Sequence, residues 1–132
     1  MTPFVQKAWA FAKEKHKGQE YSDRPFIYHP RQVYDIIKLL APKDENLLAA
    51  ALLHDTLEDT QTTYEDLVKL FNKDVADLVR EVTKTGSNTF ANLKSLRATI
   101  LKLADRTANY SNAHNFPPDR LEKYMLKVFW KA

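Results

Sequence analysis

Residues 47–60, LLAAALLHDTLEDT, decide the fold of this chain and indicate its chemistry. Seven consecutive Leu and Ala residues lead directly into the dipeptide His54-Asp55, and Glu58 and Asp59 follow shortly after. An unpaired charge is strongly disfavoured in a protein interior, so buried charges are usually paired or bind a metal. The stretch therefore predicts a helix that enters the core and carries a polar, candidate metal-binding cluster at its inner end.

Length and composition describe an ordinary globular domain. The chain has 132 residues, of which 44% are hydrophobic and 28% are charged. This length fits a single domain, residues 1–132, that can bury a substantial core. The absence of cysteine excludes a disulfide framework and a thiolate metal site, so a metal would be held by nitrogen and oxygen atoms.

The charge pattern argues against nucleic acid and membranes as partners. The net charge is +3, but the basic residues are spread along the chain rather than gathered in one block. No apolar run reaches the roughly 18 residues that a membrane span needs, and the N-terminus lacks the apolar core of a signal peptide. We expect a soluble cytoplasmic protein, and the sequence is compatible with a monomer or a homo-oligomer.

Only two glycines and a recurrent 3.6-residue apolar period predict an all-α fold, an orthogonal bundle of about six or seven helices. Residues 19–28 are expected to form a loop, and residues 85–92, TGSNTFAN, are the best candidate for a mobile loop. The expected helices run from Pro3 to Gly18, from Pro30 to Pro42, from Asp44 through His54-Asp55, from Thr63 to Phe71, from Asp74 onward, from about Leu93 to Asn109, and through the last residues around Tyr124, Val128 and Phe129.

Helical spacing would gather the polar residues of the deciding stretch on one wall of a cavity. If the helix continues to Asp59, His54 lies above Glu58 and Asp55 lies above Asp59, since residues four apart share a face. Three neighbouring carboxylates repel one another unless a cation is present. The alternative is a helix end whose acids are simply solvated.

His29 and Asp105 are the candidate companions of this wall. His29 precedes Pro30, which should hold its backbone extended and give its side chain a fixed direction that suits a ligand. It could equally be a capping or core-edge histidine. Asp105 borders the buried face of ILKLADRTAN, where the alternative is an ordinary salt bridge with a nearby lysine or arginine.

Other polar residues carry weaker signals. Asn109, one turn after Asp105, could orient that carboxylate or meet a substrate, and Lys102, one turn before it, could face a phosphate. Both are also compatible with plain surface positions. His16 and His114 lack supporting neighbours in the sequence, and we expect surface or structural roles for them.

The ordered pattern of His29, His54-Asp55 and Asp105 resembles the HD-domain metal-dependent phosphohydrolases. The strings PFIYHPRQV, ALLHDTLEDT, EVTK and ILKLADRTAN are similar, more narrowly, to the hydrolase domain of the bifunctional alarmone enzymes and to their small stand-alone relatives. The similarity covers nearly the whole chain, and the Glu58-Asp59 pair follows the His-Asp pair at the spacing of that branch.

The resemblance implies a phosphohydrolase whose small-molecule substrate is a nucleotide. The implied reaction removes pyrophosphate from the 3′ position of guanosine tetra- or pentaphosphate, with Glu58 and Asp59 handling the nucleophilic water and the protons. It also implies a single Mn²⁺, although an oxygen- and nitrogen-rich site is compatible with Fe²⁺ or Zn²⁺ as well. The implied metal ligands are His29, His54, Asp55 and Asp105.

Three departures from the family pattern concern the nucleotide pocket. Alarmone hydrolases typically carry an Arg-Lys pair where this chain has Glu20 and Tyr21, whereas Ser22 matches a residue that lines their pocket. Tyr21 could stack on a base, and Glu20 would repel phosphate. Residues 110–112, Tyr-Ser-Asn, replace the usual Met-Arg-Thr, and the segment after Lys84 is shorter than in many relatives.

Two rival hypotheses remain open at this point. The first is an HD-domain phosphohydrolase that acts on another nucleotide or on a phosphorylated cofactor, which Glu20 and Tyr21 favour. The second is a metal-stabilised sensor or interaction module without turnover, which would be expected to lose some of the ligands or acids that this chain retains.

Overall fold

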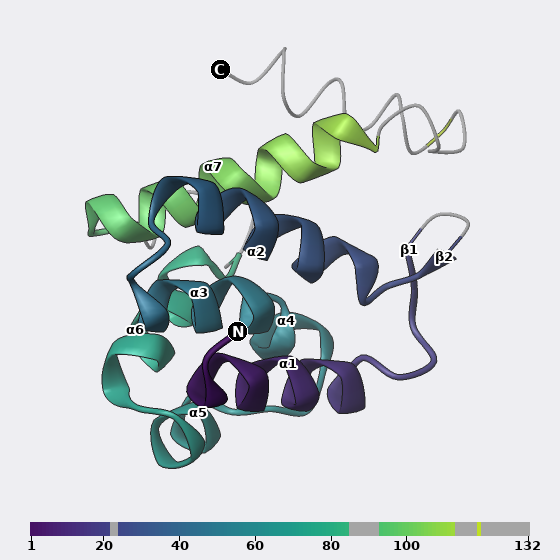
Figure 1. Ribbon diagram of the computed structural model, residues 1–132. Helices are drawn as coiled ribbons and strands as arrows, with labels where there is room; N and C mark the ends of the chain where they lie inside the picture. The colour runs from purple at the N-terminus through teal and green to yellow at the C-terminus, as the bar shows by residue number, and fades with distance from the viewer. Residues whose placement is uncertain (22–23, 85–92, 113–118, 120–132) are drawn as a thin grey trace.

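The computed structural model describes residues 1–21, 24–84, 93–112 and 119 (Figure 1). Over these residues the regular secondary structure is helical apart from one short hairpin, which confirms the predicted all-α class. The loop expected at 85–92 and the helix expected at the end of the chain lie outside the described residues. The elements are α1 Pro3–Lys15, β1 Glu20–Tyr21, β2 Arg24–Pro25, α2 Tyr28–Leu40, α3 Glu45–Leu53, α4 Thr56–Asp59, α5 Tyr64–Leu70, α6 Lys73–Val82 and α7 Leu96–Ser111.

Helix α3 is the centre of the bundle. All seven of its Leu and Ala residues are buried, because α3 packs against α1, α2 and α6 together. Figure 1 shows α3 between α1 and α2. Alanines on both sides, Ala8 and Ala12 of α1 among them, keep the helices close. Each fully buried leucine contributes about 1.5–3 kcal/mol, so this short helix supplies much of the hydrophobic driving force.

Local capping explains most of the helix boundaries. The Thr2 hydroxyl accepts from the backbone of Val5 at the start of α1, with Pro3 at the first helical position, as expected. The helix ends at Lys15, three residues before the predicted Gly18, which follows with φ +84°. At α5, Thr63 and Asp66 form a reciprocal capping box. Among the described residues, no helix is long and apolar enough to cross a membrane.

Three further predicted helix boundaries were wrong by a few residues. Asn72, rather than Asp74, caps α6, because its side-chain oxygen accepts from the Val75 backbone at 2.8 Å. Helix α7 begins after Ser95 instead of at Leu93, because the Ser95 hydroxyl accepts from the Ala98 backbone. It also continues to Ser111 rather than ending at Asn109.

Residues 19–28, predicted as a loop, contain a two-stranded antiparallel hairpin instead. Glu20 pairs with Pro25 and Tyr21 with Arg24, and the Phe26 backbone donates to the Gln19 carbonyl at 2.8 Å to close the base. Strands of two residues are too short to produce the alternating pattern by which strands are recognised in a sequence. The hairpin lies beside the first turn of α2 (Figure 1).

Helix α2 begins at Tyr28, so the prediction of an extended backbone at His29 was wrong. Pro30 is the third residue of the helix, where its missing N–H leaves no helical hydrogen bond unmade. The His29 backbone instead donates to the Phe26 carbonyl at 2.9 Å. His29 is therefore held by a helical turn, which fixes its side chain more firmly than an extended entry would.

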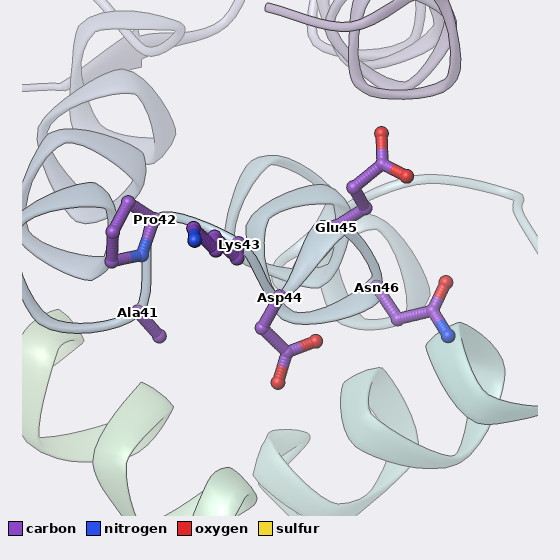
Figure 2. A pocket seen from close by; sticks show the side chains of 6 residues that line it. All are labelled: Ala41, Pro42, Lys43, Asp44, Glu45 and Asn46. Atoms are coloured by element: carbon purple, nitrogen blue, oxygen red, sulfur yellow. The ribbon is translucent and has the colours of Figure 1, made fainter.

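Arg97 joins the starts of three helices. Its guanidinium forms two hydrogen bonds of 2.8–2.9 Å with Asp44, the cap of α3, and two of 2.9 Å with Asp74 in the first turn of α6. Figure 2 shows the turn before α3, where residues 41–46 line a pocket and Asp44 points away from Glu45. The hydrogen bonds from Arg97 hold the pKa of both Asp44 and Asp74 below the ordinary value of 3.8.

We predict that Arg97→Met lowers the free energy of unfolding by about 1 kcal/mol near neutral pH, since a partly exposed charged cluster is screened by solvent. A carboxyl whose folded pKa is depressed contributes stability above its unfolded pKa and loses it as the pH falls through the folded value. The difference between variant and wild type should therefore shrink below about pH 4. Urea unfolding at several pH values measures it, with Lys43→Met at an exposed position as the control. An undiminished difference in acid would contradict the ionic origin.

Candidate metal centre

The deciding stretch does not form one continuous helix. Helix α3 ends at Leu53, and α4 begins at Thr56, so the expected continuous face through Asp59 was wrong. The imidazole Nδ1 of His54 donates to the Ala51 carbonyl at 2.7 Å, and the Thr56 hydroxyl donates to the Leu53 carbonyl at 2.7 Å. These side chains satisfy carbonyls at the end of α3, which allows the helix to stop inside the core.

Four side chains from three helices converge at this break. The Nε2 atoms of His29 and His54 are 3.3 Å apart, and Asp105 Oδ1 lies 2.7 Å from the first and 3.3 Å from the second. Asp55 Oδ2 lies 3.0 Å from His54 Nε2 and 3.7 Å from His29 Nε2. The structure thus brings together all four residues that the sequence singled out as ligands.

Hydrogen bonding sets the tautomer of His54. A carbonyl can only accept, so the contact with Ala51 places the proton of the neutral ring on Nδ1 and leaves the lone pair of Nε2 facing the cluster. His29 also directs Nε2 into the cluster, and its buried Nδ1 has no hydrogen-bond partner among the described residues. Two imidazole lone pairs and two carboxylates form a suitable donor set for a divalent cation.

The electrostatics of the cluster show how strongly it favours positive charge. Burial acts to lower the pKa of His54, but Asp55 and Asp105 outweigh it and raise that pKa well above its usual value. Burial acts to raise the pKa of Asp105, but hydrogen bonds with His29 and His54 hold it well below its usual range. A cation in the cluster would satisfy the same carboxylates that otherwise hold a proton on the histidine.

A polar pocket of about 200 Å³ opens onto the cluster. Glu58 and Asp59, the predicted catalytic acids, line it from α4, and their carboxylates lie close to that of Asp55. The other described residues that line the pocket are Tyr21, Phe26, His29, Asp55, Lys84, Lys102, Asp105 and Asn109.

Asp59 is tied in place through its backbone. The Gln19 side chain donates to the Asp59 carbonyl at 2.9 Å, and its own oxygen accepts from Nδ1 of buried His16 at 2.8 Å. Partial burial and the charges of Asp55 and Glu58 raise the pKa of Asp59 to about 6, although the residue reaches solvent. A carboxyl of this kind can both hold and release a proton near neutral pH.

Of the predicted substrate-binding residues, Lys102 and Asn109 both lie beside Asp105. Lys102 lines the pocket, but its ammonium lies 3.3 Å from Asp105 Oδ2 and 3.4 Å from the Val82 carbonyl. Asn109 places its amide nitrogen 3.5 Å from Asp105 Oδ1. Contact of either residue with a substrate stays a prediction. Ser22 lies outside the described residues.

Three pocket features were not found by sequence reasoning. Tyr21, for which the sequence left stacking on a base open, is buried and stacks on His29, with ring centroids 5.0 Å apart. Lys84 adds a positive charge at the mouth, and the string EVTK was the available signal for it. Gln19 joins α4 to the hairpin base through a contact across 40 residues, for which the sequence shows no pattern.

A sequence model of the HD domain matches residues 8–94, more than half of the chain. The chain belongs to the HD-domain family. Membership implies a divalent metal, and the donor atoms of this HD domain fit one, since neighbouring ligands about 2.1 Å from an octahedral ion lie about 3 Å apart. The candidate group of His29, His54 and Asp105, with Asp55 beside it, has that spacing.

Relatives of this HD domain include both long and short proteins. It is 36% identical over 141 residues to the guanosine-3′,5′-bis(diphosphate) 3′-pyrophosphohydrolase MESH1 of Xenopus tropicalis, covering 96% of this chain and 79% of the relative. It is 39% identical over 133 residues to the enzyme of that activity from Aquifex aeolicus, covering 90% of this chain and 19% of the relative. The chain spans about a fifth of the length of the long bacterial relatives.

A solved structure shares the fold. It is described as "A metazoan ortholog of SpoT hydrolyzes ppGpp and plays a role in starvation responses", and it superposes with a TM-score of 0.82 at 32% identity. The superposition covers 96% of this chain and 82% of the other. The predicted HD-type helical bundle is thereby confirmed.

We predict that Mn²⁺ raises the melting temperature of this HD domain, because a ligand that binds only the native state stabilises it, by about 2.7 kcal/mol at a hundred times its dissociation constant. Asp105→Asn keeps the shape of the side chain but removes its charge, and it should abolish the shift. Differential scanning calorimetry measures both proteins, with the exposed Asp35→Asn as the control. A full shift in Asp105→Asn would overturn the assignment of Asp105 as a ligand.

We predict further that the carboxyl of Asp59 titrates near pH 6 in the metal-free protein, and that a bound cation moves the titration to lower pH. The direction follows because a nearby positive charge favours the carboxylate. Carboxyl chemical shifts recorded by NMR with and without diamagnetic Zn²⁺ measure it, and Asp59→Asn identifies the resonance. A midpoint that does not move would place Asp59 outside the field of the metal.

Proposed function

We propose that this HD domain is a metal-dependent phosphohydrolase that removes the 3′-pyrophosphate from guanosine tetraphosphate (ppGpp) or pentaphosphate. The observation that carries the proposal is the convergence of four donor atoms beside two acids, in a chain that aligns over almost its whole length with a relative named for this activity. The proposed metal is Mn²⁺, held by His29, His54, Asp55 and Asp105.

The chain's own residues would position the cation and the substrate. When bound, a divalent cation supplies charge to neutralise the phosphoryl group and to lower the pKa of the attacking water. His29 and His54 present Nε2 to it, with the tautomer of His54 set by Ala51. Asp105 is oriented from its other side by Lys102, whose ammonium lies beside Oδ2.

Glu58 and Asp59 would move the protons. Attack of water on the 3′-linked phosphorus requires a base for the water and an acid for the departing ribose oxygen. The pKa of Asp59 is raised to about 6 in the metal-free protein and would fall when a cation binds, so its carboxylate is suited to accept a proton from the attacking water, and Gln19 fixes its backbone. The carboxylate of Glu58 lies close to those of Asp55 and Asp59, and Glu58 serves as the partner of Asp59 in proton transfer.

The charge balance of the described pocket explains why a cation is needed. Four carboxylates line it, and the ammonium groups of Lys84 and Lys102 oppose them. Lys102 is already engaged by Asp105, so a polyphosphate would meet a net negative wall without a metal. Lys84, at an exposed position, is the described cation best placed to meet substrate phosphate.

A second candidate keeps the metal centre but changes the substrate to another nucleotide or a phosphorylated cofactor. The observation that favours it is the hairpin, where Glu20 and buried Tyr21 stand in place of the usual Arg-Lys pair. Without those two cations, the nucleotide would be held differently from the pattern of the alarmone hydrolases.

The test is hydrolysis of ppGpp by purified protein loaded with Mn²⁺, followed as release of pyrophosphate and GDP. We expect turnover that Asp59→Asn reduces by about a hundredfold or more, since general acid–base catalysis contributes about 10²–10⁴-fold. Glu65→Gln on exposed α5 is the control acid. Mn²⁺ content of each variant is measured alongside, so that loss of metal and loss of proton transfer are separated.

The alternatives give different outcomes. A metal-loaded protein that leaves ppGpp intact but hydrolyses another nucleotide, in a manner dependent on Asp59, would establish the second candidate. A metal-loaded protein that hydrolyses no nucleotide phosphate would support a sensor module and overturn both enzymatic assignments.

A further inference from the structure

Tyr21 makes contacts that its place in the hairpin does not require. Only 4% of its surface is exposed, and its ring stacks on the imidazole of His29 with an interplanar angle of 26°. Its hydroxyl donates to Oδ1 of Asn109 at 2.5 Å, across 88 residues of sequence. Tyr21 thus contacts one candidate metal ligand, His29, directly, and it contacts Asn109, which lies beside a second candidate ligand, Asp105.

The hydroxyl of Tyr21 and the carboxylate of Asp105 together fix how Asn109 lies. The carboxylate can only accept, so the amide nitrogen of Asn109 points to Asp105 Oδ1, 3.5 Å away, and Oδ1 of Asn109 accepts from the Tyr21 hydroxyl. The flipped amide would set a carbonyl oxygen against the carboxylate, which is unfavourable. This Asp105 oxygen is the one that lies 2.7 Å from His29 Nε2, so the contact reaches a metal-facing donor atom.

A second cross-link holds the hairpin over α7. Arg24, which pairs with Tyr21 in the hairpin, donates to Oδ1 of Asn112 at 2.8 Å. Asn112 follows Asn109 by three residues, and its amide also donates to Gln32 of α2 at 2.6 Å. The hairpin is therefore fastened at two points, which keeps the ring of Tyr21 against the metal centre.

We propose that Tyr21 is a positioning residue of the metal centre. It holds the ring of His29 by stacking, and it orients the carboxylate of Asp105 through Asn109. Groups that orient metal ligands in this way typically contribute about 10–100-fold to metal affinity. The inference rests on the proposed function only in taking these residues to hold a divalent cation, and it does not depend on which nucleotide is cleaved.

The proposal also accounts for a departure from the family pattern. Where alarmone hydrolases carry a lysine for the nucleotide, this chain has Tyr21, which supports the metal ligands His29 and Asp105 in the proposed role. The hairpin then contributes to metal binding, and the substrate anion is left to cations elsewhere in the pocket, with Lys84 the exposed one.

Mn²⁺ affinity of the purified full chain, measured by competition with a fluorescent chelator, tests the role of Tyr21. We expect Tyr21→Phe, which keeps the ring and loses the hydroxyl, to raise the dissociation constant of Mn²⁺ about tenfold. Tyr21→Leu, which loses the stacking as well, should raise it further. Tyr34→Phe removes a hydroxyl from another buried tyrosine outside the pocket and should leave the affinity unchanged.

Two further readouts separate positioning from a merely structural role. The metal-free melting temperature of Tyr21→Phe should stay near that of the wild type, while the electron paramagnetic resonance spectrum of its bound Mn²⁺ should broaden. In a double-mutant cycle, adding Tyr21→Phe to Asn109→Ala should cause little further loss, because both act on Asp105 in series. Unchanged Mn²⁺ affinity and spectrum in Tyr21→Phe would overturn the proposal, as would fully additive losses.

Failure of this inference can be told apart from failure of the proposed function. A wild-type protein that binds Mn²⁺ but leaves ppGpp intact would overturn the proposed substrate, while the comparison of Tyr21 variants still decides the positioning role. A wild-type protein that binds no divalent cation would overturn the ligand assignment and this inference together.

Discussion

The structure depends on a helix that is buried on every side and ends inside the protein. Residues Leu47–Leu53 of α3 leave no polar side chain on the helix surface, so α1, α2 and α6 can all pack against it. Its carboxyl end must then be satisfied internally, and the side chains of His54 and Thr56 do this by donating to its last carbonyls. The hydrogen bond that ends the helix also turns Nε2 of His54 toward the metal centre, so one interaction serves both stability and chemistry.

Two further candidate metal ligands come from α2 and α7, which both contact α3. His29 is held in the first turn of α2, and Asp105 in the middle of α7, two helices that pack against each other. Both positions are in regular helix, so two of the four donors are held by rigid elements, while His54 and Asp55 lie at the break between α3 and α4. Glu58 and Asp59, on the other side of the pocket, belong to α4, which is a single helical turn. The Gln19 side chain donates to the Asp59 carbonyl and links this turn to the base of the hairpin.

The two sides of the pocket differ in how closely they follow the family pattern. The candidate metal ligands His29, His54, Asp55 and Asp105 match the HD-domain pattern, whereas the hairpin departs from that of the alarmone hydrolases at Glu20 and Tyr21. In this chain the hairpin is linked to α7 by Tyr21 with Asn109 and by Arg24 with Asn112. The hairpin supplies no donor atom to the described cluster, although Tyr21 packs on His29.

The sequence by itself determined the all-α class, the core helix, the four clustered donor residues and the neighbouring acids, because apolar periodicity and charges at the end of an apolar run are local signals. Only the tertiary structure decided where the helix breaks, that His29 lies within a helix, that residues 20–21 pair with residues 24–25, and that Tyr21 stacks on His29. These features arise from contacts between residues far apart in the chain, such as Tyr21 with Asn109 and Gln19 with Asp59. A local pattern carries no record of such contacts, since each partner is an ordinary polar residue until the fold brings the two together.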